Sequence, residues 1–210
     1  VLKDIHLEVS KGDFISITGP SGAGKSTLLH ILGALDTPDT GEIFFKGTPL
    51  HTMSTAQQAA WRNLHLGFVF QFHHLLPEFT VLENVCMPAY IAGLPISETE
   101  KKAKDLLTRL GLEKRIHHKP SELSGGESQR TAIARALINK PDILLADEPS
   151  GNLDTKNAES LHQLFIEIQK EWNQTIIVVT HNLSLAGLSH RHISMRDGKI
   201  EMDVKQSHHD

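Results

Sequence analysis

Residues 19–27, GPSGAGKST, combine three glycines, a lysine and hydroxyl side chains within nine positions. They match the phosphate-binding pattern G-x-x-x-x-G-K-[ST] and lie between an expected strand and an expected helix, the context that the pattern requires. Glycines let backbone N–H groups converge on an anion, and the following helix start adds a favourable dipole. Lys25 would supply a charge to the β- and γ-phosphates of a nucleotide, and the Ser26 hydroxyl would ligate Mg²⁺. The expected cradle consists of Gly19, Pro20, Ser21, Gly22, Ala23, Gly24, Lys25, Ser26 and Thr27.

Two adjacent carboxylates end an apolar strand in ILLADE, residues 143–148. Asp147 fits the position that holds magnesium in phosphate-loop NTPases. Glu148 comes one residue later and points elsewhere, so it could activate the attacking water as a general base, an effect of roughly 10²–10⁴-fold. The pair therefore favours hydrolysis of the bound nucleotide.

A second glycine-rich helix start, LSGGESQR, occupies residues 123–130. Two glycines and a serine at the beginning of a helix make a second anion site. Because one nucleotide needs only one phosphate cradle, we infer that another subunit holds its other face. The alternative interpretation of this stretch alone is a glycine-rich helix cap.

These motifs resemble those of the nucleotide-binding subunits of ABC transporters, over essentially the whole chain. LSGGE resembles the family's signature motif, and GPSGAGKST, ILLADE and SGNLD resemble its Walker A, Walker B and D-loop elements, in the family's order. The resemblance implies an ATP-sandwich dimer of two copies arranged head to tail. Lys25 of one copy would face Ser124, Gly125 and Gly126 of the other across each ATP.

The resemblance also implies roles for residues whose types alone are uninformative. Gln71 would sense Mg²⁺ and the γ-phosphate, His181 after IIVVT would contact the γ-phosphate, and Asp154 would belong to the D-loop. The implied catalytic residues are Lys25, Gln71, Glu148 and His181. The implied magnesium ligands are Ser26, Gln71 and Asp147.

The elements that must position these motifs follow from the pattern of apolar residues. FISIT, DILLAD and TIIVVT are short, nearly continuous apolar strands, and a helix is expected over about residues 156–171, so the sequence predicts an α/β fold with a buried parallel sheet. The resemblance implies a P-loop, ABC-type ATPase core with an N-terminal antiparallel β portion and an inserted α-helical subdomain. The core would comprise about residues 1–85 and 141–210, and the helical subdomain about 86–140.

Several element boundaries are also predicted. LEV at residues 7–9 is expected to be a strand. Ser97 and Glu100 have the spacing of a capping box, which predicts a helix start there, and Gly111 is an expected stop. QRTAIARALINKP is expected to form a second helix that Pro141 ends.

Composition limits the setting in which this ATPase would act. The formal net charge of −4 argues against broad nucleic-acid binding, and no apolar stretch reaches the roughly 20 residues that span a bilayer. The single Cys86 fits a reducing compartment. The resemblance therefore implies a peripheral subunit on the cytoplasmic face of a bacterial inner membrane, bound to integral membrane permease subunits. Because Val1 begins within an expected strand, we expect a short preceding segment to carry the family's adenine-stacking aromatic residue.

Within the family, QFHHLLPEFTVLENV at residues 71–85 most resembles the subunits that energise lipoprotein release from the inner membrane. Macrolide exporters and a cell-division ABC protein share LADEPSGNLD in style and remain alternatives, as does, less well, a soluble ABC ATPase of DNA repair or translation. The sequence departs from the family pattern at Ser150, where threonine is commoner, and at Asn182, where aspartate is usual. Four apolar residues form either a socket for a partner helix or part of the core: Phe72, Leu75, Leu76 and Phe79.

Overall fold

The computed structural model describes residues 1–205. Its main sheet has six strands in the order β4-β5-β6-β1-β7-β8, and the pairs are parallel from β4 to β7, whereas β8 is antiparallel. The strands are β1 (Phe14–Thr18), β4 (Leu66–Phe70), β5 (Ile143–Asp147), β6 (Thr175–Val179), β7 (Arg191–Arg196) and β8 (Lys199–Lys205). A separate antiparallel pair consists of β2 (Phe44–Phe45) and β3 (Thr48–Pro49). The predicted α/β fold with a largely parallel sheet is confirmed.

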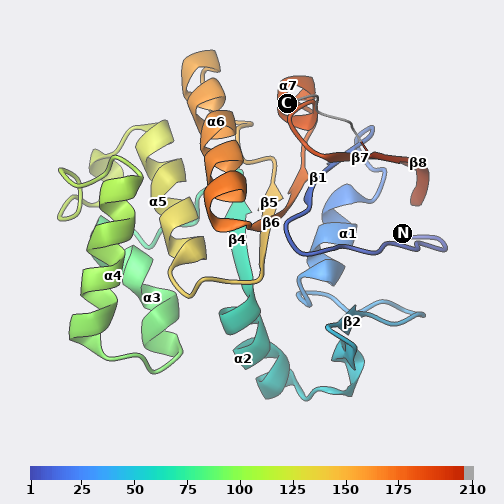
Figure 1. Cartoon of the computed structure of the whole chain (residues 1–210), viewed down its shortest axis with the longest axis horizontal. Coiled ribbons are helices and arrows are strands. Elements are labelled where there is room, and N and C mark those ends of the chain that lie inside the picture. Colours follow the sequence, from blue (N-terminus) through green and yellow to red (C-terminus); the bar gives the residue numbers. More distant parts are fainter. Residues whose placement is uncertain (206–210) are drawn as a thin grey trace.

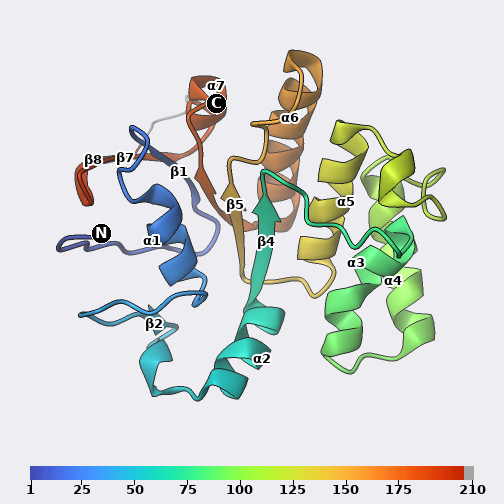
Figure 2. The ribbon, with the colours of Figure 1, turned by 180° about the vertical axis from the view of Figure 1, so that it is seen from behind.

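Helices cover the two faces of the sheet, as Figures 1 and 2 show, with α1 on one side of the strands and α5 and α6 on the other. The helices are α1 (Lys25–Leu32), α2 (Thr55–His65), α3 (Val81–Ile91), α4 (Ile96–Arg109), α5 (Gly125–Leu137), α6 (Thr155–Trp172) and α7 (Leu183–Ala186), with 3₁₀ turns η1 (Leu50–Thr52) and η2 (Pro120–Glu122). Side chains of alternate strand residues point to opposite faces, so Ile176 joins the core under α3 to α6 and Ile177 joins the core under α1. This explains the continuous apolar strands, since both faces are buried.

The register of the parallel strands brings their carboxyl ends to one edge. Phe70 pairs with Asp147, and Val179 pairs with both Asp147 and Ile17. The loops that follow β1, β4, β5 and β6 therefore leave the sheet side by side. In open α/β sheets this edge is where ligands bind.

Helices α3, α4 and α5 pack together beside the sheet, and both ribbon views place them on the side away from α1. Their shared core contains the apolar faces of α3 and α4 and the middle of α5. Among residues 1–205, no helix combines the length and the hydropathy needed to cross a bilayer.

Three boundary predictions were wrong. Residues 1–9 form no strand, neither at Val1 nor over 7–9: Ile5, Leu7 and Val9 pack on the core under α1, yet the segment makes no regular ladder. Helix α4 begins at Ile96 after an extended Pro95, so Ser97 lies inside the first turn and is not the cap. Helix α5 ends at Leu137, four residues before Pro141, and residues 138–140 lie outside it, where Lys140 has a left-handed φ of 52°.

Other boundary predictions hold. Gly111 follows the end of α4 with φ of 71°, a conformation that glycine adopts without strain. The helix expected over about 156–171 is α6, and it begins and ends one residue outside that range. Capping boxes do occur in the chain, at the starts of α2, α3 and α5, with the pairs Ser54–Gln57, Thr80–Glu83 and Ser124–Glu127.

Candidate active site

The phosphate-loop residues 19–27 connect β1 to α1 at the carboxyl edge of the sheet. Gly19 must be glycine, because a Cβ there would lie 2.1 Å from the backbone oxygen of Met195. Gly24 has φ of 97° and stands at the N-cap of α1 without a side-chain cap, so the free N–H groups of that helix start can serve a bound anion. The loop has the geometry of an anion cradle.

Lys25 is the first residue of α1, and its ammonium group turns back onto the loop that precedes it. Its Nζ donates to the carbonyl oxygens of Gly19 at 2.8 Å and Pro20 at 3.0 Å. The charge is therefore already held at the mouth of the cradle.

Ser26 and Asp147 bring two oxygen ligands together beside the cradle. The Ser26 hydroxyl donates to Asp147 Oδ1 at 3.2 Å. Burial raises the pKa of the Asp147 carboxyl, and the neighbouring Glu148 carboxylate raises it further, while the bond from Ser26 lowers it. Hydroxyl and carboxylate oxygens suit Mg²⁺, which usually completes its shell with water and phosphate oxygens. Within residues 1–205 no cluster of three or more His, Cys, Asp or Glu side chains could hold a metal by itself.

Glu148 directly follows β5 and is fixed at both its backbone and its carboxylate. Its φ is 46°, a left-handed value that is uncommon outside glycine, and its N–H donates to the Val179 carbonyl at 2.9 Å. Its Oε2 accepts the backbone N–H of His181 at 3.2 Å and lies 2.9 Å from Nδ1 of the same residue. The ends of β5 and β6 thus align a carboxylate with an exposed imidazole.

Gln71 follows β4 and contacts the turn after β5. Its Nε2 donates to Asn152 Oδ1 at 3.0 Å, and Asn152 Nδ2 donates to the Gln71 carbonyl at 3.3 Å. Gly151 must be small here, since an added Cβ would lie 2.9 Å from Gln71 Nε2. The Gln71 amide is thereby held on the segment that joins Glu148 to Asp154.

Ser124 is the N-cap of α5, and Gly125 and Gly126 form its first residues. Ser124 exchanges two capping bonds with Glu127, at 2.8 and 3.3 Å, and Arg115 Nε donates to Glu127 at 2.7 Å. The Ser124 backbone N–H and the nearby guanidinium lower the pKa of Glu127 to about 2. The signature segment, residues 123–127, therefore presents a helix start that is already capped.

The signature segment and the phosphate loop of one chain belong to different parts of the fold. Gly126 packs against Asn157 of α6, and the backbone N–H of Asn157 donates to the carboxylate of Asp154, the N-cap residue of α6. Figures 1 and 2 place α5 and α1 on opposite sides of the strands. The structure thus gathers Lys25, Ser26, Gln71, Asp147, Glu148 and His181 at the ends of neighbouring strands, and it joins Ser124, Gly125, Gly126 and Asp154 in a second group.

Three structural partners of the site were missed from the sequence: Asn152, Glu127 and His162. Nothing in the sequence pointed to the contact of Asn152 with Gln71, apart from the place of Asn152 within SGNLD. Glu127 could have been found, because Ser124 and Glu127 have the same capping-box spacing as Ser97 and Glu100. His162, which bonds to Ser150 after β5, could also have been found, because it stands four residues after Ala158 and three before Phe165 on the buried side of α6. Of the four candidate socket residues, Phe72, Leu76 and Phe79 are exposed, whereas Leu75 is half-buried.

Comparison with known proteins agrees with this geometry. The model of the ABC transporter family matches residues 2–151. The lipoprotein-releasing system ATP-binding protein LolD of Cytophaga hutchinsonii is 58% identical over 200 residues, covering 95% of this chain and 91% of that protein. The protein of the same name from Bacteroides fragilis is 56% identical over 200 residues, covering 95% and 93%.

Solved structures give the same picture. The dimeric structure of MJ0796, a bacterial ABC transporter cassette, superposes with a TM-score of 0.89 at 41% identity, covering 97% of this chain and 90% of that one. A dimeric post-hydrolysis state of the same cassette, bound to ADP and Pi, gives a TM-score of 0.88 at 40% identity with the same coverage.

Proposed function

Because this chain belongs to the ABC transporter family, we propose that it is the subunit that hydrolyses ATP to drive release of lipoproteins from a bacterial inner membrane toward the outer membrane. The observation that carries this proposal is the identity of 56–58% with two lipoprotein-releasing ATP-binding proteins over 95% of the chain. The loops at the carboxyl edge of the sheet would supply the residues that ATP hydrolysis needs.

The phosphates of ATP would bind in the cradle of residues 19–27. The N–H groups at the start of α1 face that cradle, and Lys25 can exchange its two carbonyl partners for phosphate oxygens. Ser26, Asp147 and Gln71 would hold Mg²⁺, and their oxygen atoms suit that ion. When bound, Mg²⁺ neutralises charge on the phosphates.

Glu148 would act as general base toward the attacking water, and His181 would contact the γ-phosphate. The backbone N–H of His181, at the end of β6, orients the Glu148 carboxylate. The imidazole ring of His181 is exposed at the protein surface. A carboxylate held in this way needs little reorganisation when it takes a proton.

A second copy of the chain would complete each site. Ser124, Gly125 and Gly126 lie apart from the phosphate loop of their own chain, and the MJ0796 cassette of the same fold forms a dimer. We propose that these residues close over ATP held by the partner copy, with Asp154 at the junction of the two copies. Because the Asp154 carboxylate already accepts the Asn157 N–H at the start of α6, Asp154 would contribute to the junction by where its loop lies rather than through a free carboxylate.

Residues 71–85 would dock onto integral membrane permease subunits at the cytoplasmic face of the inner membrane. Phe72, Leu76 and Phe79 are exposed in this segment, as an apolar contact for a partner helix requires. In this arrangement about residues 1–85 and 141–210 form the ATP-binding core, and about 86–140 form the helical subdomain.

Isolation of the chain together with its membrane subunits tests the proposal. The purified complex should hydrolyse ATP, and the rate should rise when lipoprotein is added in detergent or in vesicles. Pairing with the membrane subunits of a macrolide exporter or of a cell-division complex would overturn the assignment of the substrate. A chain that hydrolyses ATP and pairs with no membrane subunit would favour a soluble ABC ATPase.

A further inference from the structure

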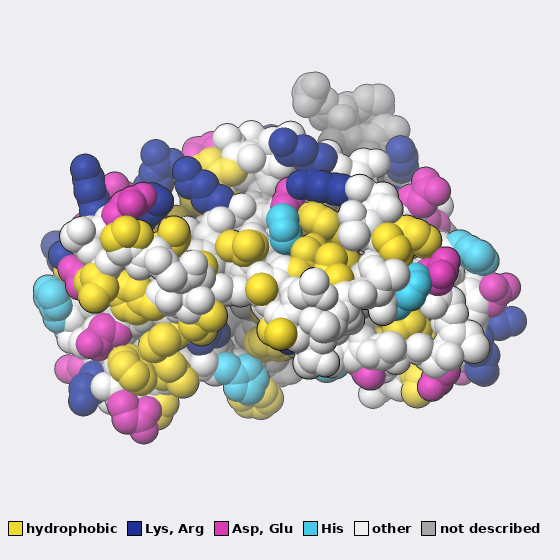
Figure 3. Space-filling model, turned by 90° about the horizontal axis from the view of Figure 1, so that it is seen from below, with side chains coloured by type: hydrophobic (Ala, Val, Ile, Leu, Met, Phe, Trp, Pro, Cys, Tyr) yellow, Lys and Arg dark blue, Asp and Glu magenta, His cyan; other side chains and the backbone are white. Residues whose placement is uncertain are grey.

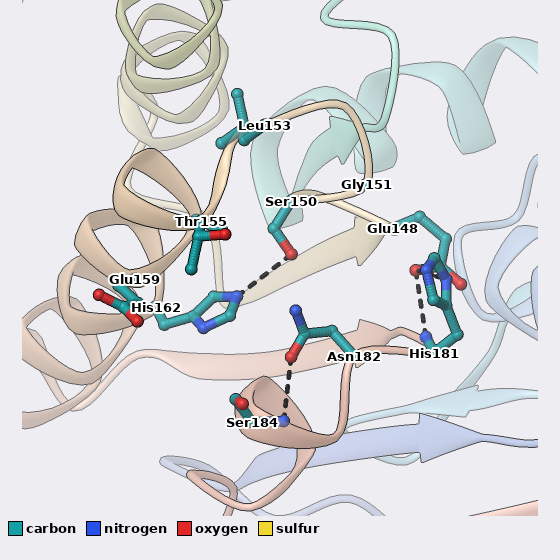
Figure 4. Close-up of a pocket in the computed structure, with 11 residues that line it drawn as sticks. Glu148, Ser150, Gly151, Leu153, Thr155, Glu159, His162, His181, Asn182 and Ser184 are labelled. Atoms are coloured by element: carbon teal, nitrogen blue, oxygen red, sulfur yellow. Dashed lines mark hydrogen bonds and ion pairs between the residues drawn. The ribbon is translucent and has the colours of Figure 1, made fainter.

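A small cavity of about 260 Å³ lies between the turn after β5, helix α6 and the start of α7. Glu148 and His181 line one side of it, and Figure 4 shows the His162 ring on the other side, next to Glu159 and pointing toward Ser150. Residues of the phosphate loop do not line it. The residues that line the cavity are Glu148, Ser150, Gly151, Leu153, Thr155, Ala158, Glu159, His162, His181, Asn182 and Ser184.

His162 and Ser150 form a buried hydrogen bond at the back of this cavity. The ring Nε2 lies 3.1 Å from the Ser150 hydroxyl, and the two residues are only 4% and 6% exposed. Burial lowers the pKa of His162, so the imidazole is neutral at pH 7 and pairs with the hydroxyl as donor or acceptor. Loss of either partner would leave the other buried without its bond, which is unfavourable.

Ser150 belongs to the turn that carries Glu148. The N–H of Gly151 donates to the Glu148 carbonyl at 3.0 Å, and the N–H of Leu153 donates to the Ser150 carbonyl at 3.1 Å. The left-handed backbone of Glu148 persists only if its surroundings hold it. The bond from His162 fixes this turn to α6, a long helix packed on the sheet.

We propose that His162 is a positioning residue for ATP hydrolysis, which through the Ser150 hydroxyl holds the turn of residues 148–151 so that the Glu148 carboxylate stays aligned with His181. The proposal rests on the role of Glu148 as general base. Ser150, the partner of His162, lines the same cavity as Glu148 and His181.

Steady-state ATP hydrolysis and equilibrium ATP binding by the full chain test this inference. His162→Phe keeps an aromatic ring but removes the bond, and Ser150→Ala removes the other partner. Since small misplacements of a reacting group are costly, each variant should lower kcat by about tenfold while ATP affinity changes by less than about twofold. The double variant should lose no more than either single variant, because both remove one interaction.

Conservative variants separate positioning from a general loss of stability. Ser150→Thr keeps a hydroxyl, and His162→Gln keeps a group that can bond to it, so both should retain most of kcat. A merely structural role would instead lower kcat in step with the melting temperature. If His162→Phe does not fold, Ser150→Ala and Ser150→Thr still make the comparison.

Three results would overturn the inference: an unchanged kcat in His162→Phe, additive losses in the double variant, or equal losses of kcat and ATP affinity. Glu148→Gln separates this inference from the proposed function. If that variant hydrolyses ATP normally, the assignment of the base is wrong. If it is inactive while His162→Phe is fully active, only the inference about His162 fails.

Discussion

The Nδ1 atom of His181 lies 2.9 Å from Oε2 of Glu148, and the backbone N–H of His181 donates to the same oxygen at 3.2 Å. Both contacts fall on one carboxylate oxygen, so this pair does not engage Oε1. The relationship joins the ends of β5 and β6, which lie side by side in the sheet. It holds one carboxylate oxygen of Glu148 in place at the carboxyl edge of the sheet, as the proposed role of general base requires.

Replacing His181 by alanine should impair catalysis more than binding. The variant removes the ring that aligns Glu148, so kcat for ATP hydrolysis should fall by roughly 10²-fold, the lower end of general acid–base effects. ATP affinity should change far less. His117→Ala, a change at an exposed loop histidine, serves as the control and should be fully active. A His181→Ala variant with normal kcat would remove His181 from the catalytic residues.

Replacing Lys25 by alanine should impair binding itself. The ammonium group sits at the mouth of the cradle on the carbonyls of Gly19 and Pro20, where it can reach phosphate oxygens. Loss of this charge should weaken ATP binding at least about tenfold, or about 1.4 kcal/mol, by titration calorimetry. Lys114→Ala removes an exposed lysine elsewhere and should bind ATP normally. Equal affinities for the two variants would contradict the phosphate-loop role.

The capping group Glu127 should make stability depend on pH. Its pKa is about 2 in the folded chain, below the ordinary value of 4.5, because the ionised carboxylate accepts the Ser124 N–H and faces Arg115. The carboxylate therefore contributes stability above pH 4.5, and this contribution is lost as the pH falls toward about 2. Urea unfolding should show that Glu127→Gln is less stable than the natural chain at pH 7, with a smaller difference at pH 3. A difference independent of pH would contradict this account of the cap.

The exposed apolar residues after Gln71 should bind the membrane partner. Phe72→Ser should reduce co-purification with the membrane subunits, because this side chain, 67% exposed, gains burial only in the complex. Ile96→Ser is a matched control, since Ile96 is 66% exposed and lies at the start of α4. Figure 3, which looks at the molecule from below, shows apolar side chains gathered on the half that carries α3 and α4. If only the Ile96 variant loses the membrane subunits, the docking surface lies on α3 and α4 and not on residues 71–85.

Much of the fold and site could be predicted because local chemistry determines it. The strand FISIT, the glycine loop and the helix at Lys25 follow from apolar runs and turn residues that need no distant partner. The grouping of Gln71, Glu148 and His181 at one edge follows from parallel strands, although only the family's order pointed to Gln71 and His181.

The predictions that failed depended on backbone geometry or on contacts between residues that are far apart in the sequence. Ser97 has the spacing of a cap, but the extended Pro95 begins the helix earlier. The bonds of Gln71 to Asn152 and of His162 to Ser150 link separate elements, and residue type alone does not reveal such partners.

In the proposed mechanism, two copies of this chain close around ATP. Glu148→Gln should bind ATP and remain closed because the bond to the γ-phosphate is not broken. Light scattering of this variant with ATP and Mg²⁺ should give about twice the 23.3 kDa mass of one chain, and Lys25→Ala added to it should restore the monomer. A Glu148→Gln variant that binds ATP yet stays monomeric at every concentration would contradict the account.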